Sequence, residues 1–104
     1  MIEIRVDGGF VEITGHAEFA RLREGDPICA GVSALFWALP YGLGDVAGAE
    51  VDVETGPDRL RVSWREALSP EGTAVVRTIV GSLREIAEKY PGRVRIKEAA
   101  AHGA

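Results

Sequence analysis

The sequence has little of what several common classes of protein require. Its single cysteine excludes an internal disulfide, and one cysteine with two histidines is too few for a multi-cysteine zinc site. Lys and Arg number 12 against 16 Asp and Glu, with no basic run, which argues against a protein that binds the phosphate backbone. No uninterrupted apolar stretch reaches the ~20 residues of a membrane span. We therefore expect no cofactor or metal, no direct nucleic-acid partner and no membrane.

What the chain does contain is the composition of a small globular domain. Hydrophobic residues make up 46% and charged residues 27% of its 104 residues, values typical of soluble folded proteins. The N-terminus, MIEIRVDGG, alternates like a strand and carries acidic residues, unlike a signal peptide. We expect one cytoplasmic domain over residues 1–98 and a frayed tail over residues 99–104.

Alternating apolar and polar residues predict two β-hairpins. In residues 1–15 the alternation is interrupted by Asp7-Gly8-Gly9, residues that favour a tight turn. Residues 50–54 and 60–64 alternate in the same way on either side of a turn at residues 56–58. A shorter run at residues 94–97 predicts a last strand.

Two helices are predicted between these strands. Asp26-Pro27 is a strong helix start, and this helix should stop at Pro40. Ser69-Pro70-Glu71 begins a second helix over residues 70–90. The expected buried stripes are Ile28, Val32, Leu35, Phe36 and Leu39 in the first helix, and Val75, Val76, Ile79, Val80, Leu83, Ile86, Ala87 and Tyr90 in the second. The order β-β-α-β-β-α-β predicts an α+β fold, one mixed or antiparallel sheet with both helices on one face.

The single cysteine, Cys29, falls in the first turn of the first predicted helix. Unpaired N–H groups and the helix dipole favour negative charge there, and the thiolate is the nucleophilic form of cysteine. Ser33 lies one turn further along the same face. Cys29 also fits a plainer interpretation, that of a small buried hydrophobic residue.

His16 comes directly after Gly15, where the second strand ends. If the first helix packs on the hairpin, the imidazole can reach the thiol, and a Cys–His pair is the minimum for nucleophilic catalysis. An ordinary surface histidine is the alternative. Asp26 favours a helix cap, although it could instead orient His16. The first-turn N–H groups that it would cap are also natural oxyanion donors.

The segment between His16 and Asp26 has four charges and is too short for a stable helix of its own. We expect a loop or a single helical turn that could act as a lid over the two candidate residues, or else an ordinary connection. The possible lid consists of Ala17, Glu18, Phe19, Ala20, Arg21, Leu22, Arg23, Glu24 and Gly25.

These residues carry a resemblance to a known family. Gly15-His16-Ala17, Gly25-Asp26 and the run Cys29–Leu35 resemble two sequence blocks of the ribosomal-processing cysteine proteases, in the same order and separation. These are small bacterial enzymes that trim the N-terminal extension of a large-subunit ribosomal protein. One departure is Pro27, where the family usually has an aliphatic residue; proline suits a first helical position.

The resemblance implies a function and a set of site residues. His16 and Cys29 correspond to the family's catalytic dyad, and Asp26 and Ser33 match two further characteristic polar positions. It implies a cysteine endopeptidase whose partner is the ribosomal-protein precursor, and a homodimer. Two alternatives remain open: a non-enzymatic ribosome-associated binding module with Cys29 as a structural residue, and a thiol-dependent redox or acyl-transfer protein. Redox cycling is disfavoured because the chain has no resolving cysteine.

Overall fold

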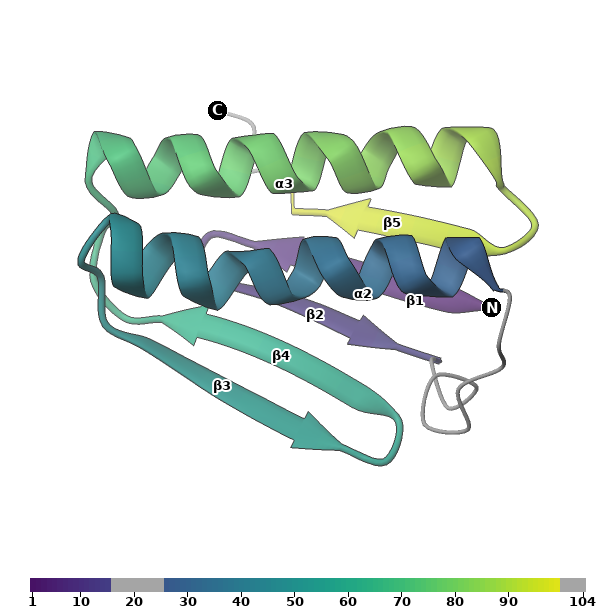
Figure 1. Ribbon diagram of the computed structural model, residues 1–104, viewed down its shortest axis with the longest axis horizontal. Coiled ribbons are helices and arrows are strands. Elements are labelled where there is room, and N and C mark those ends of the chain that lie inside the picture. The colour runs from purple at the N-terminus through teal and green to yellow at the C-terminus, as the bar shows by residue number, and fades with distance from the viewer. Residues whose placement is uncertain (16–25, 100–104) are drawn as a thin grey trace.

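The computed structural model describes residues 1–15 and 26–99, and it confirms the predicted order and fold class (Figure 1). Five strands form one sheet in the order β3-β4-β2-β1-β5, in which β1 and β5 are parallel and the other pairs antiparallel. The elements are β1 (Ile2–Asp7), β2 (Phe10–Thr14), α2 (Pro27–Pro40), η1 (Tyr41–Val46), β3 (Val51–Gly56), β4 (Arg59–Trp64), α3 (Pro70–Lys89) and β5 (Val94–Glu98).

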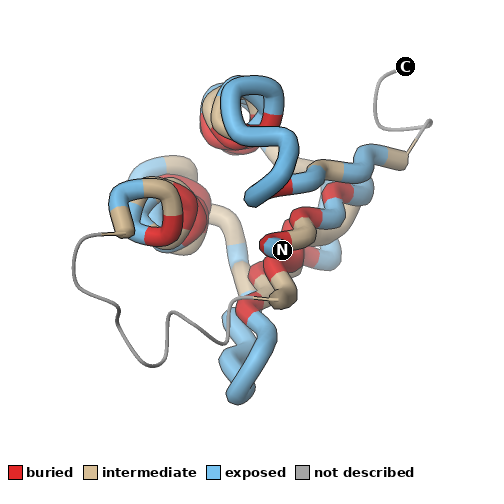
Figure 2. The backbone as a smooth tube through the Cα atoms, turned by 90° about the vertical axis from the view of Figure 1, so that its right-hand side faces the viewer, coloured by how far each residue is buried: buried red, intermediate tan, exposed pale blue. Residues whose placement is uncertain are grey.

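The core lies between the sheet and the two helices, which cover the same face of the sheet (Figure 2). Strand register produces this face: Ile4 pairs with Ile13, and Val11 pairs with both Val6 and Val62. All of these side chains are buried. Phe36 of α2 is fully buried among them. The alternation seen in the sequence therefore becomes one apolar and one polar side of the sheet.

The α-helix ends at Pro40, as predicted, but the chain stays helical beyond this residue. α2 includes Pro40 and passes into the π-helical segment η1. Proline removes one N–H donor, and wider turns follow, such as the bond from the Ala47 N–H to the Gly42 carbonyl at 2.9 Å. The continuation is packed into the core: Leu43 is fully buried, and a Cβ on Gly42 would lie 2.7 Å from Val75. Tertiary packing here outweighs the proline stop signal.

Because of this continuation, α2 and η1 form an apolar helical stretch of 20 residues, Pro27–Val46. By length and composition alone it could cross a membrane, which differs from the sequence expectation. The core helix of a water-soluble protein passes the same test. Phe36, Leu39 and Leu43 of this stretch are fully buried against the sheet and α3, so core packing accounts for part of its apolar character.

Most of the apolar residues predicted to face the core from the two helices are buried. In α2, Val32, Phe36 and Leu39 are buried, while Ile28 and Leu35 are partly buried against the core. In α3, the predicted stripe is buried or partly buried except at Tyr90, which is 45% exposed. Tyr90 lies beyond the last helical residue, Lys89, at φ −129°, so it leaves the helical face. Cys29 joins the buried core at 8% exposure.

The opposite face of the sheet carries a buried carboxylate. Glu12 of β2 is 3% exposed and accepts hydrogen bonds from Arg5 at 2.9 Å, Arg61 at 3.2 Å and Arg59 at 3.3 Å. The Arg61 guanidinium also lies 3.9 Å from the centre of the Phe10 ring. Cross-strand arginines therefore surround the one charged side chain that is buried among the described residues.

We expect Glu12→Ala to destabilise the fold by about 2 kcal/mol, because three closely packed arginines lose their shared acceptor. The arginines are 28–56% exposed and can be rehydrated, which limits the loss. Urea denaturation measures it. Glu54→Ala is the control: Glu54 also accepts from Arg59, but it is 55% exposed, so its loss should stay below about 1 kcal/mol. Equal losses in the two variants would contradict the expectation.

Candidate active site

Asp26 caps the first helix and so fixes the position of Cys29. Its Oδ1 accepts hydrogen bonds from the N–H groups of Ile28 and Cys29, both at 3.1 Å. Its own carbonyl accepts from the Ala30 N–H at 3.1 Å. The backbone of Asp26 is extended and Pro27 follows as the first helical residue, as the sequence predicts for a cap. The N–H groups considered as oxyanion donors are therefore already engaged in this structure.

The second oxygen of Asp26 joins the thiol to a basic residue. Oδ2 accepts the hydrogen bond of the Cys29 Sγ at 3.2 Å and an ion-paired hydrogen bond from Nη2 of Arg93 at 2.7 Å. Arg93 lies in the connection between α3 and β5, 67 residues away in the sequence. The Asp26 side chain is 20% exposed and that of Arg93 is 51% exposed. One carboxylate thus caps a helix, accepts from a thiol and pairs with a guanidinium.

These contacts keep Asp26 ionised. Hydrogen bonds from the backbone and side chain of Cys29, and then from Arg93, lower the pKa of Asp26 from 3.8 to about 2. A carboxylate with so low a pKa is a weak base. It can orient the thiol, but removal of the thiol proton at neutral pH needs another group.

The lowered pKa of Asp26 predicts an acid-dependent stability. The folded state favours the ionised form of Asp26 more than the unfolded chain does, and this difference stabilises the fold. The stabilisation is complete above pH 3.8 and is lost as the pH falls toward about 2. In Asp26→Asn this part of the pH dependence should be absent, because the amide does not titrate. Denaturant midpoints of the two proteins across this range measure the effect. Parallel curves for wild type and variant would contradict it.

Gly15 determines how the chain leaves β2 toward His16. Its φ is +75°, and a Cβ there would overlap the carbonyl oxygen of Met1, so a side chain would be both strained and obstructed. Figure 1 shows that β2 ends at the same end of the molecule at which α2 begins. His16 itself and the possible lid, residues 17–25, lie outside the described residues. The predicted contact between His16 and Cys29 therefore stays a prediction.

Ser33 lies within α2, four residues after Cys29, and is partly buried. This spacing places the two residues one helical turn apart, as the sequence predicts. Its role in the site stays a prediction.

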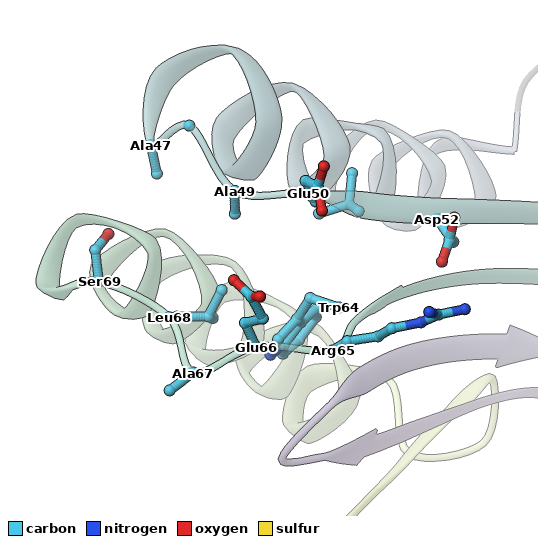
Figure 3. A pocket seen from close by; sticks show the side chains of 12 residues that line it. Ala47, Ala49, Glu50, Asp52, Trp64, Arg65, Glu66, Ala67, Leu68 and Ser69 are labelled. Atoms are coloured by element: carbon cyan, nitrogen blue, oxygen red, sulfur yellow. The ribbon is translucent and has the colours of Figure 1, made fainter.

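A hollow of about 600 Å³ lies at the other end of the sheet, where β3 begins and β4 ends (Figure 3). Residues 47–52 and 64–69 line it, and Glu50, Glu66 and Trp64 are among them. It includes neither Cys29 nor Asp26, so it is separate from the candidate site. No group of three or more His, Cys, Asp or Glu among the described residues could hold a metal ion.

Comparison with known protein families identifies the family of this chain. The family model described as cysteine protease Prp matches residues 1–95. The chain belongs to the Prp family of cysteine proteases. This confirms the family resemblance that the sequence motifs indicated. A comparison with curated protein sequences finds no match.

Solved structures share the fold at low identity. The ribosomal processing protease Prp of S. aureus, with a covalently linked product peptide, aligns with a TM-score of 0.83 at 20% identity over 95% of this chain and 100% of that chain. The same enzyme with a substrate peptide gives 0.81 at 19%, again over 95% and 100%. SMU.848 from Streptococcus mutans gives 0.73 at 19%, over 93% of this chain and 90% of that chain.

Arg93 is the site residue that the sequence analysis missed. It lies far from both sequence blocks, and a single arginine after Pro91-Gly92 has no distinguishing pattern. The one signal available was that Arg93 comes just before the last predicted strand, whose pairing partner the sequence does not identify.

Proposed function

We propose that this Prp-family protein is an endopeptidase that removes the N-terminal extension of a large-subunit ribosomal protein during ribosome assembly. The observation that carries the proposal is a thiol held in the first turn of α2 by Asp26, within a chain that matches the Prp family over residues 1–95. The S. aureus structures with substrate and covalently linked product peptides support a peptide substrate.

In this proposal Cys29 is the nucleophile and His16 its proton acceptor. The Cys29 thiolate attacks the scissile carbonyl carbon, and the proton taken by His16 passes to the leaving amine. Water then attacks the thioester, with His16 as base, and releases the new carboxylate and the thiol. Asp26, already ionised and capping α2, holds the Cys29 side chain in place through Oδ2.

The oxyanion that forms during attack needs hydrogen-bond donors. The N–H groups of Ile28 and Cys29 are occupied by Asp26. Either they become available when Asp26 shifts on substrate binding, or donors come from elsewhere. The resemblance further suggests a homodimer, and the composition suggests a cytoplasmic protein; we include both in the proposal.

The binding-module alternative treats Cys29 as core filler, and its 8% exposure fits that role. The contacts of Cys29 favour the enzyme interpretation. Its sulfur lies against a carboxylate that is paired with an arginine, and a purely structural core cysteine does not require such polar partners. Incubation with the host's own precursor ribosomal protein tests the choice. Mass spectrometry should show a single new N-terminus in the precursor and none in a version that lacks the extension. An uncleaved precursor would favour the binding module.

A further inference from the structure

The backbone of Arg93 is fixed where the last strand begins. Its N–H donates to the Tyr90 carbonyl at 2.9 Å, and its carbonyl accepts from the Ile2 N–H at 2.9 Å. The first bond closes the turn after α3, and the second extends the pairing of β5 with β1. The backbone of Arg93 is therefore held in one position, from which its side chain reaches Asp26 at the N-terminus of α2.

The side chain of Arg93 ends at the atom that holds the thiol. Its Nη2 lies 2.7 Å from Asp26 Oδ2, the same oxygen that lies 3.2 Å from Cys29 Sγ. The hydrogen bond and charge of Asp26 raise the pKa of Arg93 above its usual value, and those of Cys29 do so to a lesser degree. The guanidinium is thus coupled to both residues.

The Asp26 carboxylate and the Arg93 guanidinium have opposite effects on the Cys29 thiolate. A carboxylate that accepts from a thiol favours the protonated thiol, because loss of the proton would place two negative charges side by side. A guanidinium on the same oxygen offsets that repulsion and holds the carboxylate in its cap position. Without this cation, the Asp26 charge would act on the sulfur unopposed.

We propose that Arg93 is a positioning residue of the active site: it holds Asp26 on the α2 cap and the Cys29 thiol, and it offsets the Asp26 charge so that the thiolate can form. This inference rests on the proposed protease function for its catalytic consequence. Its effect on the thiol can be measured without any substrate.

The test is the rate of alkylation by iodoacetamide as a function of pH, which reports one site because the chain has one cysteine. In Arg93→Ala the midpoint of this profile should move upward by about one pH unit, so that alkylation near pH 7 slows about tenfold. Arg93→Lys keeps the positive charge and should recover most of the rate. Arg93→Gln keeps a polar side chain without charge and gives the same comparison if the alanine variant does not fold.

Arg95→Ala is the matched control. Arg95 lies two residues further on, is 53% exposed and pairs with Glu3 at 3.0 Å. The Arg95→Ala variant therefore loses a similar surface ion pair, but one away from the thiol. Its alkylation profile should equal that of wild type. Coincident profiles for Arg93→Ala, Arg93→Gln and wild type would overturn the proposal, and so would a downward shift.

Cleavage of the precursor, measured in parallel, separates the two proposals. With an active wild type, kcat/KM near pH 7 should fall about tenfold in Arg93→Ala and recover in Arg93→Lys. If wild type does not cleave but Arg93→Ala still shifts the alkylation profile, the protease function fails and the role of Arg93 at the thiol stands. If wild type cleaves and the alkylation profile does not move, the role of Arg93 fails and the protease function stands.

Discussion

Cys29→Ala should abolish cleavage of the precursor ribosomal protein while the fold persists. The substitution removes the only thiol in the chain, and no thioester can form without it. The side chain removed is small and its loss leaves Asp26 able to cap α2 through Oδ1. We therefore expect a stability loss of only about 1 kcal/mol, or a decrease in Tm of about 4–8 °C.

Mass spectrometry of the precursor after incubation, together with a thermal melt, measures both parts of this expectation. Ser33→Ala is the matched control on the same helix, one turn away, and should lose less activity. Undiminished cleavage by Cys29→Ala would rule out the cysteine-protease mechanism. If Cys29→Ala loses both cleavage and the folded state, Cys29→Ser tests the role of the nucleophile instead, because serine retains a hydrogen-bond donor to Asp26.

His16→Ala should lower the cleavage rate by about 10²–10⁴-fold, the usual contribution of a positioned general acid–base group. Asp26 cannot take over, since its pKa of about 2 makes it too weak a base at neutral pH. Alkylation of Cys29 near neutral pH should also slow, because the thiolate loses its ion-pair partner. The helix dipole, which remains together with Arg93, is worth ~0.3–1 kcal/mol, under one pKa unit.

The chain supplies its own control for this variant, since His102 is its other histidine. His102→Ala should match wild type in cleavage and in the pH profile of alkylation. Identical alkylation profiles for wild type and His16→Ala would show that His16 does not act on the thiol, and the proposed dyad would have to be abandoned.

Local sequence by itself determined the hairpins, the α2 cap and the candidate nucleophile. The cap needs only Asp26, Pro27 and the two N–H groups that follow, all within one turn. The hairpins need only alternation and a turn, so their partners are adjacent along the chain. The sequence blocks that carry the family resemblance are equally local, because each is a short run of residues adjacent along the chain.

Tertiary structure decided what joins distant parts of the chain. Arg93 reaches Asp26 across 67 residues only because β5 pairs with β1. Glu12 meets Arg59 and Arg61 only through the register of β2 and β4. The helix continues beyond Pro40 because burial of Leu43 and contact with Val75 outweigh the local proline signal. Sequence spacing carries information on near neighbours, whereas strand pairing and core packing bring together side chains whose separation along the chain gives no signal.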